Sequence, residues 1–430
     1  MSRKTLFGGN GRTDTLTLEG LRVIDPGEGI DECLTVTIEN GIVTRLEPGS
    51  ANGGGRVLAP AFIDPHVHLR TPGREDEEDI ASGTEAAAAG GYCAILAMPN
   101  TDPVVDSAAV LGALVEQAKT EARVPVGFLA SISKGQDGEQ LTEMIELAEA
   151  GAAGFTDDGR PVVSASLLRR ALQYVGVAGG RVALHEEDPA LTSDGQMHEG
   201  SVSAELGLGG WPSVAESTMV ARDLALAAYE RRPLHLLHVS ARESVAELRR
   251  AQAAGVDATA EVTPHHLCLT DESLRSLDTN LKMNPPLRAE DDRQALISAL
   301  VDGTIGAVAT DHAPHARHEK DVPFEEAPFG VTGLETAFAA LHTCLVRPGV
   351  LPLPTLLERL SAGPAAIYGL ERPRVAVGAT ANLVLLDLDR EWRVEAGRFR
   401  SRSANSWLLG RALTGRVELT VANGRVAYEA

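Results

Sequence analysis

Short apolar runs alternate with helical stretches through the middle of the chain. Between about residues 60 and 365, eight apolar runs each end in a polar cluster, and Ala/Leu-rich stretches such as 166–177 and 244–255 fill the gaps. Parallel strands are buried on both faces and therefore read as unbroken apolar runs. Eight strand-then-helix units predict an α/β fold, a (β/α)8 TIM-type barrel. The runs are AFID before His66, AILAM before Pro99, VGFLA at 126–130, AGF at 153–155, VAL before His185, LHLL before His238, ATAEV before Thr263 and GAVAT before Asp311.

The two ends of the chain carry a different pattern. Residues 14–47 and 415–430 contain short alternating runs, each with an Asn-Gly pair, Asn40-Gly41 and Asn423-Gly424. Such pairs between alternating runs predict β-hairpins. A lone hairpin cannot bury a face, so we expect the ends to pair into one small β-sandwich-like domain. The predicted division is 1–58 with 366–430 for this domain, and 59–365 for the barrel.

Composition and charge narrow the function classes. The 430 residues include 39 Lys plus Arg and 60 Asp plus Glu, which gives a formal net charge of −21. This charge would repel a phosphate backbone or an anionic bilayer, so neither nucleic acid nor a membrane is expected as a partner. Residues 86–99 are uncharged but too short to span a bilayer, and residues 1–15 lack the apolar core of a signal peptide. A cytoplasmic protein with a small-molecule substrate is expected.

Reactive side chains stand at the ends of the predicted strands. His66 and His68 form an HxH pair whose imidazoles point to one face of an extended chain, and the other candidates end later strands. In a barrel, these positions converge on the C-terminal mouth, where active sites of this fold lie. Imidazoles and carboxylates suit one or two divalent cations, with zinc first and manganese or cobalt as alternatives. The predicted metal ligands are His66, His68, Asp157, His185, His238 and Asp311.

Several of these residues have simpler interpretations. A single strand-end Asp is most often a helix cap, and periodicity does not decide which of the adjacent Asp157 and Asp158 faces the mouth. His235 would face away from His238 in a strand, as a buried histidine with satisfied hydrogen bonds. A structural or supporting role is expected for His265 and His266. Six candidates at the ends of five strands nevertheless favour a metal site over capping.

A second group of residues could hold an anion. Arg70 is two residues beyond His68 on the same side of an extended segment, Asn100 ends the second run, and Asn284 and Arg288 lie in KMNPPLR. The alternative for Arg70 is a salt bridge to the acidic residues 75–79, a run that is most simply a solvated helix start. We expect Arg70 to contact a substrate carboxylate.

The predicted site suits hydrolysis. A bound divalent ion lowers the pKa of water from about 15.7 to about 7 and polarises a carbonyl. Asp311 could accept the proton of the attacking water and pass it to a leaving nitrogen. Redox chemistry is less favoured, because the chain has no cofactor cradle and more candidate ligands than a 2-His-1-carboxylate iron site.

Six sequence blocks resemble the dihydroorotases of the long bacterial type, within the amidohydrolase superfamily. The blocks are DPHVHLR with TPG, GGYCAILAMPNTDP, GFTDDGRPV, EVTPHHL, DTNLKMNPPLR and ATDHAPH, and the resemblance covers roughly residues 55–370. It implies reversible, metal-dependent cyclisation of N-carbamoyl-L-aspartate to L-dihydroorotate in pyrimidine synthesis. Ring closure removes one carboxylate charge and consumes a proton, so lower pH should favour closure.

The resemblance also implies roles for single residues. His66 and His68 would bind one metal, His185 and His238 a second, and Asp157 would bridge the two. Asp311 would be both a ligand and the catalytic acid/base. The substrate carboxylate would be held by Arg70, Asn100 and His315, and the pyrimidine ring would contact Asn284 and the loop of Pro328, Phe329 and Gly330.

The chain departs from the family at three positions near the site. Thr71 stands where Glu is usual, a Lys is usual near Glu77, and Glu186 stands where a Cys usually follows the ligand His185. None of them is a predicted ligand. Glu186 would add negative charge beside a metal-binding imidazole, so metal affinity could differ from the family norm.

Two other functions fit the sequence less well than the dihydroorotase function. Hydantoinases and allantoinases bridge their metals with a carboxylated lysine after strand four, but none of the five lysines of this chain (4, 119, 134, 282 and 320) lies there. An inactive scaffold for aspartate transcarbamoylase should have lost metal ligands, whereas this chain keeps all six. An enzyme is therefore expected, and a homodimer or an association with that transcarbamoylase is left open.

Overall fold

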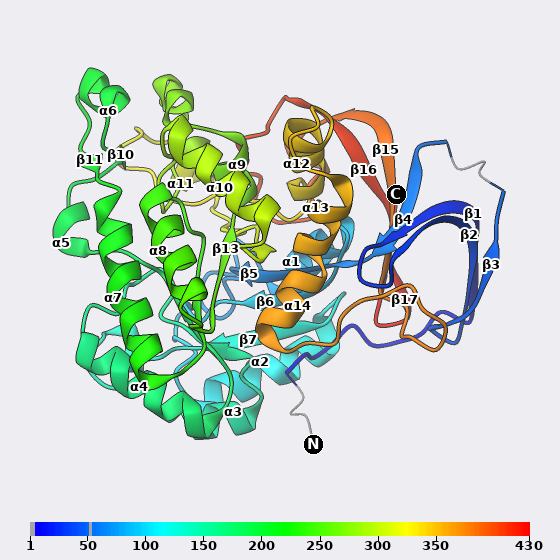
Figure 1. Ribbon diagram of the computed structural model, residues 1–430, viewed down its shortest axis with the longest axis horizontal. Helices are drawn as coiled ribbons and strands as arrows, with labels where there is room; N and C mark the ends of the chain where they lie inside the picture. Colours follow the sequence, from blue (N-terminus) through cyan, green and yellow to red (C-terminus); the bar gives the residue numbers. More distant parts are fainter. Residues whose placement is uncertain (1–4, 51–53) are drawn as a thin grey trace.

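A parallel barrel and a mixed sheet form the two parts of the protein (Figure 1). The computed structural model describes residues 5–50 and 54–430. Eight parallel strands follow one another around the barrel in sequence order, which confirms the predicted fold. They are β5 (Phe62–Val67), β6 (Tyr92–Ala97), β7 (Val126–Ala130), β8 (Gly154–Phe155), β9 (Val182–Leu184), β12 (Leu234–Leu236), β13 (Ala258–Val262) and β14 (Ala307–Val308). The first and last strands meet through a parallel bridge between Val67 and His312, which closes the barrel.

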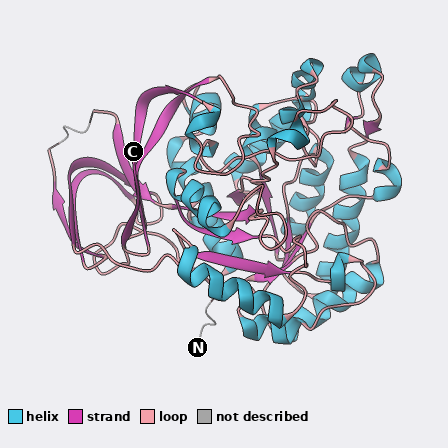
Figure 2. Cartoon of the chain, turned by 180° about the vertical axis from the view of Figure 1, so that it is seen from behind, coloured by secondary structure: helices cyan, strands magenta, loops and turns pink. Residues whose placement is uncertain are grey.

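Helices surround the barrel strands (Figure 2). They are α1 (Ile80–Ala89), α2 (Ala108–Glu121), α3 (Met144–Ala150), α4 (Ala165–Ala178), α5 (Pro189–Thr192), α6 (Ser201–Leu206), α7 (Val214–Glu230), α8 (Arg242–Ala253), α9 (Pro264–Cys268), α10 (Glu290–Asp302), α11 (Arg317–Lys320), α12 (Ala337–Leu341), α13 (Leu353–Leu360) and α14 (Ala362–Tyr368). Two short strands, β10 (Met197–His198) and β11 (Gly210–Trp211), pair between α5 and α7. Among the described helices, none has the length and apolarity needed to cross a membrane.

The mixed sheet draws its strands from both ends of the chain. Its order is β17-β16-β15-β4-β1-β2-β3. The strands are β1 (Thr15–Asp25), β2 (Ile30–Glu39), β3 (Ile42–Pro48), β4 (Arg56–Pro60), β15 (Leu383–Arg393), β16 (Ala412–Ala422) and β17 (Arg425–Glu429). Only Ala61 separates β4 from the first barrel strand, so the sheet and the barrel are directly joined. The residue limits 1–58, 59–365 and 366–430 stay a prediction, and residues 1–4 and 51–53 lie outside the described residues.

The two predicted hairpins are confirmed. Strands β2 and β3 are antiparallel around Asn40-Gly41, and β16 and β17 are antiparallel around Asn423-Gly424. Both residues of each pair have positive φ, at 52° and 77° in the first pair and 49° and 78° in the second. Two-residue turns of this kind match the twist of the flanking strands, and Asn-Gly is the pair that adopts them at low cost.

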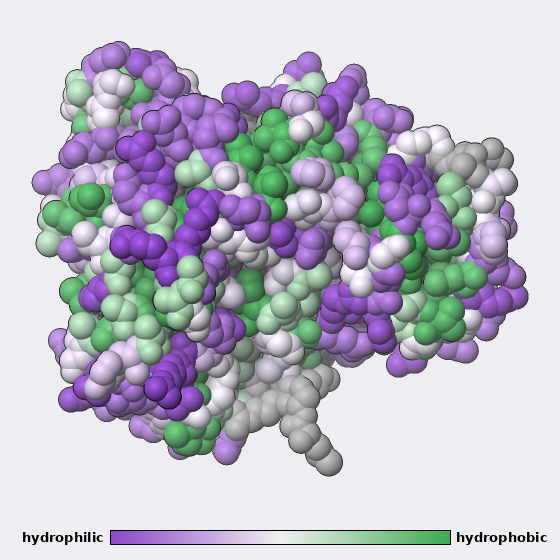
Figure 3. Space-filling model, viewed as in Figure 1, coloured by the Kyte–Doolittle hydropathy of each residue, from purple (hydrophilic) through white to green (hydrophobic). Residues whose placement is uncertain are grey.

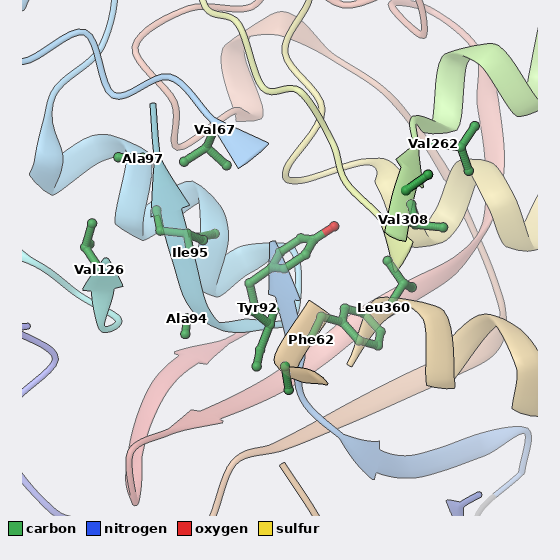
Figure 4. Close-up of a cluster of buried hydrophobic side chains, with 14 of the residues drawn as sticks. Phe62, Val67, Tyr92, Ala94, Ile95, Ala97, Val126, Val262, Val308 and Leu360 are labelled. Atoms are coloured by element: carbon green, nitrogen blue, oxygen red, sulfur yellow. The ribbon is translucent and has the colours of Figure 1, made fainter. Parts of the chain in front are cut away.

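The apolar runs fill the barrel interior and the layer beneath the helices. Phe62, Tyr92 and Ile95 are almost completely buried, and they lie beside the other labelled side chains in Figure 4. Burying such side chains stabilises the fold by about 1.5–3 kcal/mol each before entropy is counted. On the face drawn in Figure 3, hydrophilic and hydrophobic residues are interspersed. The packed strands therefore serve as a rigid base for the loops at their carboxyl ends.

Candidate active site

Histidines and aspartates from five barrel strands meet at the carboxyl ends of those strands. His66 lies in β5 and His68 just beyond it, and Asp158, His185, His238 and Asp311 follow β8, β9, β12 and β14. A cavity of about 200 Å³ opens beside them, and its lining includes all these residues except the more deeply buried His66. The structure thus brings together five of the six predicted ligands, with Asp158 beside them.

The first histidine pair lies against Asp311. One carboxylate oxygen of Asp311, Oδ1, is 3.0 Å from His68 Nε2 and 3.4 Å from His66 Nε2. All three residues are buried. This arrangement leaves one face of Asp311 toward the cavity, since Asp311 also belongs to the cavity lining.

Asp158 lies between the two histidine pairs. Its Oδ2 atom is 3.4 Å from His66 Nε2 and 3.5 Å from His68 Nε2. Its Oδ1 atom is 3.4 Å from His238 Nε2 and 3.8 Å from His185 Nδ1. One carboxylate thus presents one oxygen to each pair, which is the geometry that a bridging ligand requires.

Asp157 is not part of this cluster, although the sequence predicts it as a metal ligand. Its side chain turns toward the loop after β7, where Oδ1 accepts hydrogen bonds from the backbone nitrogens of Ile132 at 2.8 Å and Ser133 at 3.1 Å. The Ser133 hydroxyl also donates to Asp157 Oδ2. Adjacent residues of an extended chain point to opposite sides, so when Asp157 caps the neighbouring loop, Asp158 faces the histidines.

Hydrogen bonds behind the cluster fix which nitrogen of each imidazole faces inward. His66 Nδ1 donates to Glu261 Oε1 at 2.7 Å, and His68 Nδ1 donates to Asn100 Oδ1 at 2.9 Å. His185 uses the other nitrogen, since its Nε2 donates to Glu187 Oε2 at 3.0 Å. Outer partners of this kind orient metal-binding histidines and leave the opposite nitrogen with its lone pair toward the ion.

Glu261 also connects the cluster to His235. The second oxygen of Glu261 is 3.0 Å from His235 Nε2, and His235 Nδ1 is 2.9 Å from Thr259 Oγ1. His235 is therefore a buried histidine with both nitrogens engaged, as predicted. His266 is likewise held between Thr263 Oγ1 and the Pro285 carbonyl.

Three site residues have backbones in the left-handed region. The φ angles are 57° at Arg70, 30° at His238 and 48° at Asp311. For a residue with a Cβ atom, this region costs on the order of 1 kcal/mol or more, and it persists where the surroundings enforce it. At these strand ends, the conformation turns the side chains toward the cavity.

The histidines and aspartates of the cluster shift one another's pKa values. Burial works against ionisation of Asp158 and Asp311, but the histidines, His66 above all, outweigh it and keep both carboxyl pKa values well below the ordinary range. Burial also opposes protonation of His66, yet Asp158 and Asp311 raise its pKa well above the usual value. Protons and divalent cations therefore compete for the same imidazole nitrogens.

The donor atoms fit divalent cations such as zinc. Two ligand atoms bound to one tetrahedral zinc ion lie about 3.3 Å apart, given bonds of about 2.0–2.1 Å. The nitrogen and oxygen atoms here are separated by 3.0–3.8 Å. Two of them, His66 Nε2 and Asp158 Oδ1, are buried with no hydrogen-bond partner among residues 5–50 and 54–430. Buried polar atoms of this kind are costly unless a further partner binds them.

The predicted substrate residues line the same cavity. Its lining contains all six of them, Arg70, Asn100, Asn284, His315, Phe329 and Gly330. Arg70 Nε donates to the Pro314 carbonyl at 3.1 Å, and His315 Nε2 donates to the Phe329 carbonyl at 2.8 Å. Gly330 has a φ of 121°, and a Cβ atom there would lie 2.7 Å from Ala313 Cβ, so the close approach of these loops requires glycine.

Residues 75–79 differ in part from the expected solvated helix start. Glu75 and Asp76 are exposed, but Glu77 and Glu78 are almost completely buried. Glu77 lies 3.0 Å from Arg70 Nε, so Arg70 makes the alternative salt bridge and lines the cavity at once. Asp79 does begin a helix, since its side chain caps α1 by accepting from the Ser82 backbone.

Two supporting carboxylates were not predicted. Glu261 interrupts the apolar run ATAEV, and an acidic residue inside a run predicted as a buried strand is the signal that could have identified it. Glu187 lies two residues beyond His185 and so on the same side of an extended segment. Both carboxylates accept from histidines of the cluster.

The surroundings of Glu186 work against the negative charge expected beside His185. Burial, together with the charge of Asp223 and a hydrogen bond to it, raises the pKa of Glu186 well above its usual value. The nearby Arg222 lies 2.5 Å from Asp223. Burial and the charge of Asp223 thus both oppose ionisation of Glu186.

The chain is similar in sequence to known dihydroorotases. A family described as Dihydro-orotase-like matches residues 55–244. A protein named dihydroorotase from Geobacter sp. (strain M21) is 47% identical over 423 residues, which covers 96% of this chain and 99% of that protein. A dihydroorotase from Anaeromyxobacter dehalogenans (strain 2CP-C) is 45% identical, with 97% and 98% covered.

Solved structures of hydantoinases share the fold. The L-hydantoinase (dihydropyrimidinase) from Arthrobacter aurescens superimposes with a TM-score of 0.85 at 24% identity, covering 96% of each chain. The D-hydantoinase (dihydropyrimidinase) from Thermus sp. gives a TM-score of 0.78 at 21% identity, also covering 96% of each. At this identity the likeness extends to the fold alone.

Proposed function

The chain belongs to the dihydroorotase family, and from this we propose that it is a cyclic amidohydrolase that interconverts N-carbamoyl-L-aspartate and L-dihydroorotate in pyrimidine biosynthesis. The observation that carries the proposal is the position of Asp158 between two histidine pairs, with Asp311 beside the first pair and an arginine-lined cavity in front. A substrate with an amide to be attacked and a carboxylate to be held fits this cavity.

The residues suggest two cations, with zinc as the first choice. His66, His68 and Asp311 would hold one ion. His185 and His238 would hold the second ion, and Asp158 would bind both ions. Imidazole and carboxylate ligands suit zinc, with manganese and cobalt as alternatives. When bound, such ions lower the pKa of water and polarise an amide carbonyl.

Asp311 is the proposed acid and base of the reaction. The pKa of Asp311 lies well below its ordinary value despite burial, because His66 and His68 favour the charged form, so Asp311 is a carboxylate at neutral pH. In hydrolysis it would accept a proton from the attacking water and deliver this proton to the ring nitrogen that leaves. In ring closure the same carboxylate would remove the proton from the carbamoyl nitrogen.

Other residues of the cavity lining would bind and orient the substrate. We assign the substrate carboxylate to Arg70 and His315, with Asn100 beside them, and the ring to Asn284 and the Phe329-Gly330 loop. Asn100 has a second role, since its side chain holds His68. An arginine on a buried wall gives a strong charge-assisted contact to a carboxylate and also fixes its orientation.

A hydantoinase activity is the alternative that shares this fold. The family feature that distinguishes it, a lysine between the metal sites, has no counterpart here, because Asp158 stands between the two histidine pairs. Lys282 and Lys320 instead donate to backbone carbonyls around residues 324–328. These contacts favour the dihydroorotase activity.

An assay in both directions tests the proposal. The purified protein, supplied with Zn²⁺, should hydrolyse L-dihydroorotate and close N-carbamoyl-L-aspartate, with little activity on hydantoin. Because closure consumes one proton, the ratio of ring to open form at equilibrium should rise about tenfold for each unit of pH lowered between pH 8 and 6. Turnover of hydantoin but not of dihydroorotate would contradict the proposal.

Replacing Arg70 by alanine should chiefly weaken substrate binding. Loss of a charge-assisted contact to a carboxylate is worth about 1.5–3 kcal/mol, so KM for L-dihydroorotate should rise by roughly 10–100-fold. Inhibition by 5,6-dihydrouracil, the same ring without the carboxylate, should change little. Steady-state kinetics with both compounds measure this difference, and an equal loss for both would remove Arg70 from the carboxylate site.

A further inference from the structure

A segment of the C-terminal part lies across the loops that carry the proposed substrate residues. This segment, residues 401–405, comes from the connection between β15 and β16 of the mixed sheet, and we call it the clasp. Ser401, Ser403 and Asn405 are each at least nine-tenths buried. None of these three residues lines the catalytic cavity.

Asn405 joins two of the substrate loops. Its Oδ1 accepts from the His315 backbone nitrogen at 3.1 Å, and its Nδ2 donates to the carbonyls of Ala313 at 3.1 Å and Gly330 at 3.2 Å. The Asn405 carbonyl accepts from the Thr332 backbone nitrogen at 2.9 Å. A single side chain thus binds the backbone of the loop that presents His315 and of the loop that presents Phe329 and Gly330.

The rest of the clasp holds the loop that carries Arg70. Ser403 Oγ donates to the Glu77 carbonyl at 2.8 Å, and the Ser401 hydroxyl donates to Glu78. The Glu77 side chain in turn lies 3.0 Å from Arg70 Nε. Glu78 also accepts from His312 Nε2 at 3.1 Å, next to Asp311 in the chain.

We propose that the clasp is a positioning element for the substrate carboxylate, with Asn405 as its principal residue. By binding the loops after β5 and β14 and the loop at residue 330, the clasp sets the distance between Arg70, His315 and the Phe329-Gly330 backbone. Asn405 lines the neighbouring cavity that shares His315, but it is absent from the lining of the catalytic cavity, so it acts through other residues. This inference rests on the proposed function, because it needs a carboxylate held by Arg70 and His315.

The Asn405 side-chain amide both accepts and donates hydrogen bonds, which explains why an asparagine suits this position. The site offers one N–H and two carbonyls at close range, and an asparagine side chain supplies one acceptor and two donors. Removing it would leave three buried backbone groups without this partner, which frees the two loops to move apart. The histidines and aspartates of the metal-binding cluster would keep their contacts, because the Asn405 side chain bonds to backbone groups of the loops and not to these side chains.

Replacing Asn405 by alanine should separate binding from chemistry. KM for L-dihydroorotate should rise at least about tenfold while kcat stays within about threefold, since the misplaced groups bind the carboxylate and one side of the ring, whereas Asp311 and the histidines keep their places. The zinc content should stay close to that of the unchanged protein, and inhibition by 5,6-dihydrouracil, which meets the Phe329-Gly330 loop but has no carboxylate, should weaken much less than binding of L-dihydroorotate. Ser406→Ala is the matched control, because among residues 5–50 and 54–430 the Ser406 hydroxyl bonds only to the nearby Leu408 backbone nitrogen. The kinetics of this control should be normal.

The outcomes are distinct. If Asn405→Ala is folded and its KM is unchanged, or if inhibition by 5,6-dihydrouracil weakens as much as substrate binding, the positioning role is wrong. If that variant does not fold, Ser403→Ala takes its place, and an unchanged KM there would overturn the role equally. Failure of the unchanged protein to turn over L-dihydroorotate would instead overturn the proposed function.

Discussion

Replacing Asp311 by asparagine should reduce kcat by at least about 10³-fold in both directions, because an amide cannot accept the proton that the reaction moves. The shape of the side chain is kept, so the fold should survive. Asp311 lies 3.0 Å from His68 Nε2, and the amide is a weaker partner there, so some loss of metal affinity should accompany the loss of turnover. Steady-state rates with L-dihydroorotate and N-carbamoyl-L-aspartate, together with zinc content and thermal unfolding, measure these effects.

Asp137→Asn provides the matched control for this substitution. Asp137 is exposed and its side chain forms a 3.6 Å ion pair with Arg160, so the same chemical change there should leave turnover normal. Near-normal kcat in Asp311→Asn would show that another group transfers the proton. A control that lost activity as well would point to a general effect of the substitution on the preparation.

Replacing Asp158 by alanine should remove metal binding and turnover together. Its two oxygens face the two histidine pairs, so its loss takes one ligand from each proposed ion and leaves four imidazoles without the carboxylate between them. We expect zinc content to fall from two ions toward none and kcat to fall by at least about 10³-fold, since metal activation of water is lost. Metal analysis after gel filtration, with the rate assay, measures both.

The neighbouring substitution Asp157→Ala should have a different effect. It removes the acceptor for the Ile132 and Ser133 backbone nitrogens and for the Ser133 hydroxyl, which should lower the free energy of unfolding by about 2 kcal/mol or more. Zinc content per folded molecule should be retained. If Asp157→Ala lost its metal while Asp158→Ala kept it, the placement of the two aspartates described above would be wrong.

The barrel and most of the site could be predicted from the sequence because both depend on local patterns. Each parallel strand is an unbroken apolar run, and side chains just beyond such runs must meet at one end of a barrel. His66, His68, His185, His238 and Asp311 were found in this way. The terminal hairpins were equally local, since Asn-Gly pairs specify the turns of β2-β3 and β16-β17.

Features that depend on distant packing could not be predicted. The choice between Asp157 and Asp158 is set by the loop after β7, which offers two backbone N–H groups to Asp157. The sequence predicts that Glu77 and Glu78 are solvated carboxylates. In the structure they are buried, because Arg70 and the clasp pack against them. Asn405 bonds to groups 75 to 92 residues away, and no periodic pattern in its own segment points there.

The most direct test is a crystal structure of the zinc-loaded protein with anomalous scattering measured at the zinc absorption edge. We expect two peaks at the carboxyl ends of the barrel strands, one beside His66 and His68 and one beside His185 and His238, with the Asp158 carboxylate between them. Zinc bound away from these imidazoles, or bridged by Asp157 with Asp158 turned aside, would contradict the metal site on which the proposed chemistry depends.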